Sequence, residues 1–267
     1  MKILFVVFNT NTTLRTKRHM AKTGINLSTI EAQEVYNSAF NTAGHNPYAA
    51  QDKRILEFEP FNVVLQKVQR IAPNKYITIA GGAVRDLYVQ DEKLIKDIDV
   101  FILDVKDNAE KQEIIANCSR MLAGGPQHQL YPGANFNCLW NTAYPNMDAA
   151  SFKAWGFGLS GKNKIQYAVQ IVGHAAKDVK ALLEDFDWRA CQFAYDGHSV
   201  WRDGLNDFYE NRLHLGNVRN AFYTLKRGFY LEHKFAKAGM RVAVAKEDML
   251  TLASMMLIDP EIEYNGR

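Results

Sequence analysis

The chain has few cysteines, no long hydrophobic run and no strong excess of charge of either sign. Its three cysteines, Cys118, Cys138 and Cys191, lie far apart and form no CxxC pair, which argues against a disulfide framework or a structural zinc site. No stretch approaches the roughly 18 consecutive apolar residues of a membrane-spanning helix. We therefore expect thiols in a reducing compartment and no membrane association.

The start of the chain does not have the pattern of a secretion signal. Residues 1–8 are mainly apolar, but the run stops at Asn9 and is not followed by a small-residue cleavage site. We interpret this segment as a strand and predict a cytoplasmic protein. The net charge of +3, from 32 Lys and Arg against 29 Asp and Glu, permits an anionic partner without demanding one.

The chain does have the size and patterning of a mixed protein of helices and strands. Its 267 residues suit one large domain or two small ones, at about 150 residues per domain. Apolar residues at helical spacing, or a helix start after glycine, predict helices over 61–71, 83–89, 108–122 and from 218 onward, with a break near Gly239 and a last helix over 250–258. Short apolar or alternating runs predict strands over 76–80, 98–103 and 165–171.

Two glycines join the first of these strands to the helix that follows it. Gly81 and Gly82 let a phosphate approach the backbone, while the free amides and the dipole of the helix start face it. Arg85, one turn into the helix, is expected to project to the same side, where its guanidinium suits phosphate oxygens. The arrangement predicts an anion site.

Two aspartates begin the next strand. Because side chains alternate along a strand, Asp97 and Asp99 are expected on one face, with Ile98 and Val100 on the other. Two carboxylates at this separation repel each other, so their pairing makes sense if a hard divalent cation lies between them. Mg²⁺ takes oxygen ligands and keeps substrate phosphates in its shell. A glycine bend beside such a pair therefore predicts nucleotidyl transfer.

These motifs also resemble a known family. GGAVRD at 81–86 and KDIDV at 96–100 resemble the signature of the DNA polymerase β-like nucleotidyltransferase superfamily, closest to the head domain of bacterial CCA-adding enzymes and poly(A) polymerases. DWRACQFAYD at 187–196 lies where those enzymes carry RDFTINALAYD, and LKRGF at 225–229 lies near their LRxxRF. The resemblance runs from about residue 76 to residue 235.

The resemblance implies an α+β fold, in which a polymerase β-like head with a mixed sheet and flanking helices is joined to a small C-terminal helical domain. On this basis we expect an N-terminal extension over 1–55, a catalytic head over 56–215 and a short helical neck-like domain over 216–267. Within the extension, Ser28 followed by Glu31 has the capping-box pattern and predicts a helix to about residue 43.

The resemblance further implies a two-metal Mg²⁺ site and an NTP substrate, ATP and/or CTP. An acceptor hydroxyl would attack the α-phosphate and pyrophosphate would leave. Asp97 and Asp99 would be the catalytic residues and metal ligands. The nucleotide-binding residues would be Gly81, Gly82, Arg85, Asp187, Arg189, Lys226 and Arg227. The implied acceptor is the 3′-hydroxyl of a tRNA-like RNA, and the sequence indicates no protein partner.

Some positions depart from the family pattern. Phe186 stands where the family has arginine and Cys191 where it has asparagine, which leaves the base preference open. Gln170 stands on a neighbouring strand where many superfamily members carry a third carboxylate. Two alternatives therefore stay open. One is nucleotidyl transfer to a small-molecule or protein hydroxyl, and the other is a catalytically silent nucleotide- or RNA-binding module.

Two further patterns are less specific. GFGLSGK at 156–162 matches the start of a P-loop, but Asn163 replaces the Ser or Thr and a strand is expected to follow. We predict a hairpin turn over 160–163 instead. Arg227, Lys234 and Arg241, spaced by sevens, predict either a basic stripe suited to a phosphate backbone or a solvated helix face.

The carboxylate pair yields the first prediction. Asp97→Ala or Asp99→Ala should abolish turnover and leave the fold intact, because each removes an anionic oxygen ligand from a surface strand position. Nucleotide incorporation measured beside circular dichroism would test this. Retained turnover in either variant would refute the assignment of the metal site.

Overall fold

The computed structural model describes residues 49–89, 92–118, 120–121, 151–160 and 165–258. The helix expected over 28–43, Cys138 and the turn residues after 160 lie outside them. No described helix is long and apolar enough to cross a membrane.

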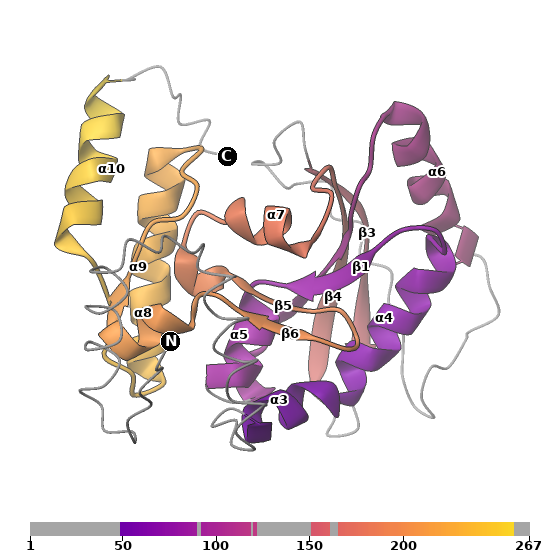
Figure 1. The fold of residues 1–267 in the computed structure, drawn as a ribbon, viewed down its shortest axis with the longest axis horizontal. Coiled ribbons are helices and arrows are strands. Elements are labelled where there is room, and N and C mark those ends of the chain that lie inside the picture. The colour runs from indigo at the N-terminus through magenta and orange to yellow at the C-terminus, as the bar shows by residue number, and fades with distance from the viewer. Residues whose placement is uncertain (1–48, 90–91, 119, 122–150, 161–164, 259–267) are drawn as a thin grey trace, which may run out of the picture. The chain divides into compact units, whose positions relative to one another are not determined.

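A six-stranded mixed sheet forms the centre of the described fold, with strand order β3-β4-β2-β1-β5-β6 (Figure 1). Its strands are β1 (Ile77–Ala80), β2 (Asp97–Ile102), β3 (Ser151–Ser160), β4 (Gln166–His174), β5 (Phe193–Tyr195) and β6 (Val200–Arg202). Strands β2 and β4 are parallel, and the other neighbours are antiparallel. The α+β class predicted from the sequence is confirmed. The strand expected to follow the P-loop-like pattern is present as β4, and the first residues of that pattern, 156–160, end β3.

Helices precede, separate and follow the strands. They are α3 (Ala49–Leu56), α4 (Glu59–Ile71), α5 (Gly82–Val89), α6 (Asn108–Cys118), α7 (Val179–Glu184), α8 (Leu205–Glu210), α9 (Ala221–Lys237) and α10 (Lys246–Ile258). Helix α4 starts two residues before its predicted start, because Pro60 occupies its first turn, where a missing backbone N–H costs nothing. Two short 3₁₀ helices, η1 (Glu92–Leu94) and η3 (Arg189–Cys191), and a small parallel sheet of β7 (Arg212–Leu213) and β8 (Ala243–Val244) complete the described elements.

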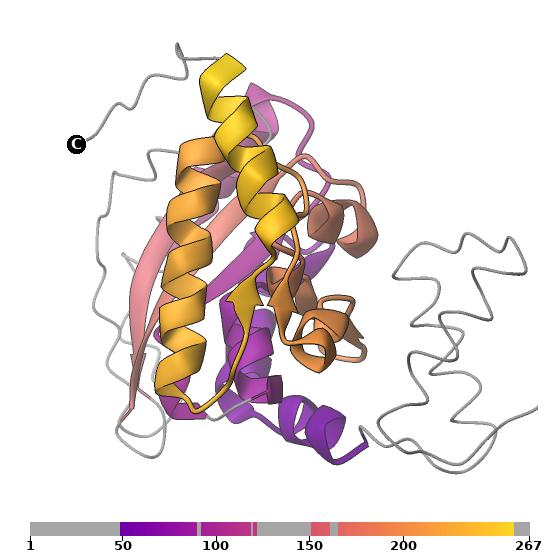
Figure 2. The same cartoon turned by 90° about the vertical axis from the view of Figure 1, so that its left-hand side faces the viewer.

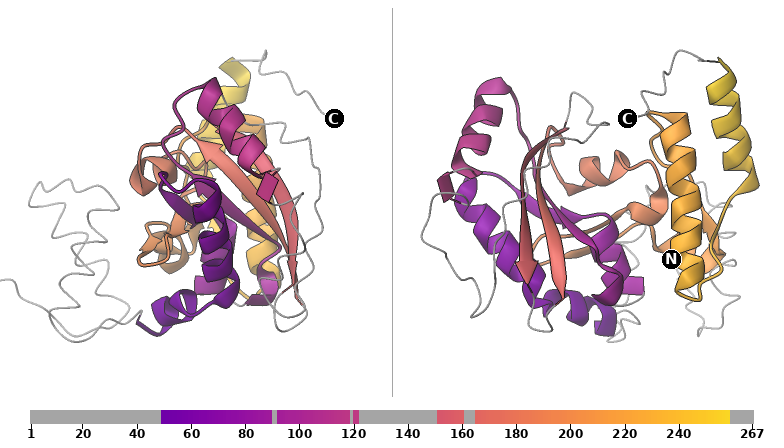
Figure 3. Two further views of the ribbon diagram at one scale, coloured as in Figure 1. Left: turned by 90° about the vertical axis from the view of Figure 1, so that its right-hand side faces the viewer. Right: turned by 180° about the vertical axis from the view of Figure 1, so that it is seen from behind.

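The first hydrophobic core lies between the large sheet and helices α4, α5 and α6. In both Figure 1 and the right-hand view of Figure 3, strands β3 and β4 lie between α4 and α6 on one side and α9 on the other. From β2, Ile98, Val100 and Ile102 enter this core and are 0% exposed. Strand alternation therefore directs Asp97 and Asp99 to the other face of the sheet.

A second core surrounds Trp188. Its ring packs with Leu231 and Phe235 of α9 and with Leu252 of α10, and its Nε1 donates to the carbonyl oxygen of Thr224 at 2.8 Å. Figure 2 shows α9 and α10 side by side, next to the β7–β8 pair. The expected boundary at residue 215 therefore runs through a shared core, because Trp188 belongs to the expected head and α9 to the expected neck.

The described fold also begins before residue 56. Helix α3, which the sequence analysis placed in the N-terminal extension, packs against α5. Its Ile55 is 0% exposed in the first core, and Asp52 accepts from Nη1 of the buried Arg202 at 2.7 Å. Residues 49–56 thus share the first core with the elements expected to form the head.

The C-terminal segment is helical with a break where glycine predicted one. Helix α9 ends at Lys237 and Gly239 adopts a φ of 78°, in the left-handed region that favours glycine. Strand β8 follows, and α10 begins at Lys246, four residues before the predicted start at 250. Arg241 lies outside α9, so the basic spacing by sevens does not continue along one helix.

Gly228 yields the prediction for the fold. A Cβ there would lie 2.5 Å from Cζ2 of the buried Trp188. Helix propensity alone would make Gly228→Ala stabilising by about 1 kcal/mol, whereas overpacking costs about 1–3 kcal/mol. Because the Trp188 ring is enclosed, we expect the cost of overpacking to exceed the gain in helix propensity. The free energy of unfolding, measured by urea denaturation, should fall by about 1–2 kcal/mol.

Gly239→Ala is the control, since nothing lies within 4 Å of its Cβ position. It should lose about 1 kcal/mol through backbone strain alone. Introducing Trp188→Phe should reduce the cost of Gly228→Ala and leave that of Gly239→Ala unchanged. A Gly228→Ala protein as stable as the wild type would show that propensity outweighs the contact.

Candidate active site

The two aspartates begin β2 on the face of the sheet opposite the first core. Asp97 is exposed and Asp99 is half-buried. In the parallel register with β4, Asp97 pairs with Ala168 and Asp99 with Gln170. Ala168 is exposed, so solvent reaches this part of the sheet beside the carboxylates.

Two glycines of β3 continue this row on the next strand; Gly158 is half-buried and Gly156 is buried. Gly158 pairs with Ala168 and Gly156 pairs with Gln170. Because paired residues share a face, no side chain from these two glycine positions covers the row that carries Asp97 and Asp99. The glycine-rich segment that resembled a P-loop thus contributes backbone without side chains at these two positions of the row.

The glycine bend lies at the same end of the sheet. Since β1 is antiparallel to β2, the end of β1 meets the beginning of β2. Gly81 adopts a φ of 86° and donates its N–H to the carbonyl oxygen of Phe193 at 2.8 Å. Helix α5 begins at Gly82, and the first amides of a helix have no intrahelical partner. The bend therefore presents amides near the start of β2.

Gln170 lies beside Asp99 on the neighbouring strand. Its Oε1 atom is buried and has no hydrogen-bond partner among the described residues. The described residues contain no group of three or more His, Cys, Asp or Glu side chains placed to hold a metal. Two carboxylates and an amide oxygen nevertheless fit Mg²⁺, which is commonly held by one or two carboxylates together with substrate phosphates.

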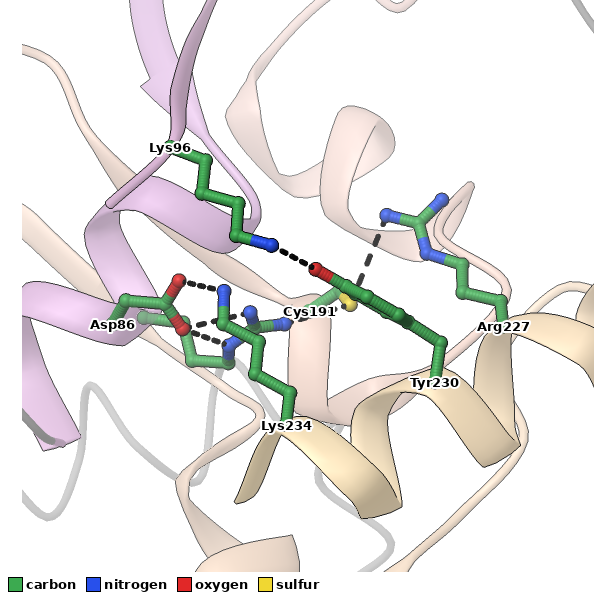
Figure 4. A network of polar contacts seen from close by, with 7 residues as sticks. Asp86, Lys96, Cys191, Arg227, Tyr230 and Lys234 are labelled. Atoms are coloured by element: carbon green, nitrogen blue, oxygen red, sulfur yellow. Dashed lines mark hydrogen bonds and ion pairs between the residues drawn. The ribbon is translucent and has the colours of Figure 1, made fainter. Parts of the chain in front are cut away.

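Arg85 does not face the open row but lies in the interior, 2% exposed. Its Nε and Nη2 donate to Oδ1 of Asp86 at 2.9 and 2.7 Å, and its Nη1 donates to Sγ of Cys191 at 3.3 Å. Lys234 of α9 donates to the other oxygen of Asp86 (Figure 4). A phosphate would have to draw the Arg85 guanidinium away from Asp86, so a direct role of Arg85 in nucleotide binding stays a prediction.

The same geometry accounts for one of the evenly spaced basic residues. Lys234 points into the protein toward Asp86 (Figure 4), and its side chain is only 12% exposed. It therefore belongs neither to a solvated face nor to a surface open to a phosphate backbone. The predicted stripe of Arg227, Lys234 and Arg241 is wrong, because tertiary contacts bury its middle member.

Arg227 links the acids of two segments. Its Nε lies 3.7 Å from Oδ1 of Asp187, and its charge also interacts with that of Asp99. Burial raises the pKa of Asp187, while the nearby Arg227 acts in the opposite direction. The structure thus brings Asp99, Asp187 and Arg227 together, with half of the Arg227 side chain exposed.

The segment that carries Asp187 is fixed by backbone pairing. Gly216 donates to the carbonyl oxygen of Asp187 at 2.8 Å, and Arg189 donates its N–H to the carbonyl oxygen of His214 at 3.0 Å. Hydrogen bonding to Asp207 raises the pKa of His214, whereas the positive charge of Arg189 lowers the pKa of the same imidazole. Arg189 is therefore near His214.

Lys226 is exposed on α9. Neither Arg189 nor Lys226 has an observed contact with the carboxylate pair. Their roles in nucleotide binding stay predictions.

Two residues beside the site were not assigned a role by sequence reasoning. Lys96, which directly precedes Asp97, donates from Nζ to the Tyr230 hydroxyl at 3.4 Å and lies 5.7 Å from the centre of its ring (Figure 4). Tyr230 is 48% exposed. Two sequence features could have identified them: Lys96 directly precedes the aspartate pair, and Tyr230 follows Arg227 by three residues, which places it on a neighbouring part of the same helix.

Comparison with known proteins gives one family match. A model described as "Gad2: Gabija anti-defense 2 family protein" matches residues 55–210, which contain the glycine bend, the aspartate pair and Asp187. No match is found among curated proteins.

Among the solved structures that match part of this chain are CCA-adding enzymes, each at low identity and with a TM-score below 0.5. The Thermotoga maritima enzyme complexed with tRNA has a TM-score of 0.43 and 15% identity, covering 75% of this chain and 43% of that enzyme. A CCA-adding enzyme with CTP has a TM-score of 0.45 and 16% identity, covering 75% and 41%. The Bacillus stearothermophilus enzyme with CTP has a TM-score of 0.38 and 16% identity, covering 73% and 42%. The chain spans less than half the length of these enzymes.

The buried ion cluster yields the prediction for this region. Asp86→Asn leaves the enclosed Arg85 guanidinium without its countercharge and should lower the free energy of unfolding by about 3–5 kcal/mol. Chemical denaturation measures this. Lys234→Met, which leaves the Arg85–Asp86 pair in place, should cost clearly less. If Asp86→Asn stayed within about 1 kcal/mol of the wild type, the cluster would not be what holds α5 against α9.

Proposed function

The chain belongs to the Gabija anti-defense 2 family, and from that premise and the geometry of the site we propose that it is a Mg²⁺-dependent nucleotidyltransferase. The reaction moves a nucleoside monophosphate from an NTP to an acceptor hydroxyl and releases pyrophosphate. The observation that supports this most directly is the row of Asp97 and Asp99, on an open sheet face at the strand end where β1 delivers Gly81 into the start of α5.

The proposed roles follow from what each element presents. The amide of Gly82, together with the dipole of α5, holds the phosphates of the nucleotide. Gly81, whose own N–H is bonded to Phe193, contributes the left-handed bend that lets a phosphate approach the start of the helix. Asp97 and Asp99 hold Mg²⁺, with the Oε1 atom of Gln170 as a neutral third oxygen. When bound, the metal supplies charge neutralisation for the phosphates and lowers the pKa of the attacking hydroxyl.

The remaining residues orient the nucleotide. Arg227 pairs with Asp187 and interacts electrostatically with Asp99, and its guanidinium can turn from these acids to a bound phosphate. The carboxylate of Asp187, fixed by the backbone pairing of its segment, can accept from a ribose hydroxyl or a base. Arg189, Lys226 and Arg85 complete the proposed nucleotide-binding set, and Arg85 would act by fixing the start of α5 through Asp86.

The first acceptor we propose is the 3′-hydroxyl of an RNA, with ATP or CTP as the donor. The half-exposed Arg227 provides positive charge near Asp99, and the exposed Lys226 precedes it on α9; such charges suit a phosphate backbone. The second candidate is a protein hydroxyl. The family's name favours this second candidate, because it refers to opposition to Gabija defense. The acceptor would then be a protein component of that defense system.

One labelling experiment separates these functions. The full chain is incubated with α-labelled ATP or CTP and Mg²⁺, and with either bulk RNA that includes tRNA or a panel of proteins. We expect label in RNA and release of pyrophosphate, both abolished by EDTA and reduced at least about 10³-fold by Asp97→Asn. This variant keeps the size of the side chain and removes its charge.

The other outcomes are equally informative. Label in protein and none in RNA would replace the first acceptor with the second. Nucleotide binding without pyrophosphate release across both panels would identify a silent binding module and overturn the proposed enzyme activity.

A further inference from the structure

The outer face of α9 carries a row of exposed side chains. Helical periodicity of 3.6 residues places six exposed positions on one side of the helix. They are Phe222, Lys226, Phe229, Tyr230, His233 and Lys237, called here the outer face. Among them Phe222 is 39% exposed, and Phe229 and Tyr230 are each 48% exposed. The opposite side, with Thr224, Leu231 and Phe235, is buried.

The chemistry of the outer face is aromatic and cationic. The only acidic residue of α9 is Glu232, which is half-buried and accepts from the N–H of Val244 at 3.2 Å. The outer face therefore offers rings and positive charges and no carboxylate of its own helix. This combination suits single-stranded nucleic acid, since any base can stack on a ring and cations track the backbone.

Tyr230 joins the outer face to the candidate active site. Its hydroxyl accepts from Lys96, the residue next to Asp97 (Figure 4). Arg227 and Lys234, which lie on the adjacent side of the helix, point toward the second core and Asp86 (Figure 4). A strand that lies along the outer face would thus reach the carboxylates at Tyr230.

We propose that the outer face of α9 binds single-stranded RNA and that Tyr230 stacks on its 3′-terminal base, which positions the acceptor hydroxyl beside Asp97 and Asp99. This rests on the proposed nucleotidyl transfer and specifies its acceptor. Phe222 and Phe229 stack on further bases, and Lys226 contacts a phosphate. Lys237 lies about 10 Å beyond Tyr230 along the helix, past the 3′ end of the strand. A duplex is disfavoured, because pairing and stacking hide the base faces that the rings need.

Binding is tested with the full chain and no NTP. The probe is a 5′-fluorescein oligouridine of about 12 nucleotides, within the span of known single-strand sites, followed by fluorescence anisotropy. Phe222→Leu and Phe229→Leu should each weaken binding about 10-fold, since stacking is lost while the site stays apolar. Tyr209→Leu is the matched control, because Tyr209 on α8 is 49% exposed and lies outside the outer face; it should leave binding unchanged.

The charged positions have a separate readout. Lys226→Gln should reduce the slope of log affinity against log salt by about 0.7, the value for one single-strand phosphate contact, whereas Lys237→Gln should leave the slope unchanged. Absence of binding at low salt, equal effects of Tyr209→Leu and Phe229→Leu, or equally tight binding of a duplex would each overturn the proposal.

Crosslinking tests the direction of the strand. An oligouridine with a photoreactive 4-thiouridine at its 3′ end should crosslink to peptides that contain Tyr230 or Lys96, whereas the same group at the 5′ end should not. The reverse pattern would overturn the role of Tyr230. Tyr230→Phe should retain the crosslink, and Tyr230→Leu should lose it.

Failure of this inference and failure of the enzyme activity are distinguishable. If the variants weaken RNA binding as expected but no acceptor is labelled and no pyrophosphate is released, the outer face stands as an RNA-binding surface and the nucleotidyltransferase is refuted. If label enters another acceptor while Phe222→Leu and Phe229→Leu leave RNA affinity unchanged, the nucleotidyltransferase activity is supported and the outer face is not its acceptor site.

Discussion

Burial of one face of β2 is the constraint on which the site depends. Ile98, Val100 and Ile102 are completely enclosed in the first core, and a one-residue slip of the strand would drive the aspartates into that core. The cost of burying two carboxylates makes such a slip prohibitive. The same hydrophobic packing that stabilises the head therefore holds Asp97 and Asp99 on the open face.

A second constraint fastens α9 beside that face. Asp86 is 1% exposed and receives hydrogen bonds from Arg85 of its own helix and Lys234 of α9. Removing the Asp86 carboxylate from this cluster would leave the buried Arg85 guanidinium uncompensated. Together with the packing of Trp188 against α9, the cluster fixes the helix that brings Arg227 and Tyr230 to the site.

Much of the fold was predictable because its signals are local. Helix α4 follows from apolar residues at helical spacing, β2 and β4 from alternation and runs of β-branched residues, and the bend at Gly81 from a paired glycine between strand and helix. The start of α10 was placed four residues late, since its early residues are polar. Helix α3 was assigned to an extension because its sequence does not reveal that Ile55 and Asp52 find partners on distant segments.

By itself, the sequence determined the strand–bend–helix unit, the shared face of Asp97 and Asp99, and the resemblance to nucleotidyltransferases, because periodicity and short motifs are properties of neighbouring residues. Only the tertiary structure decided that Arg85 faces inward, that Lys234 is enclosed, and that Tyr230 reaches Lys96. These outcomes depend on partners that lie close in space, because a buried charge is stable only where a nearby group offsets its loss of hydration. The partners come from chain segments more than a hundred residues apart.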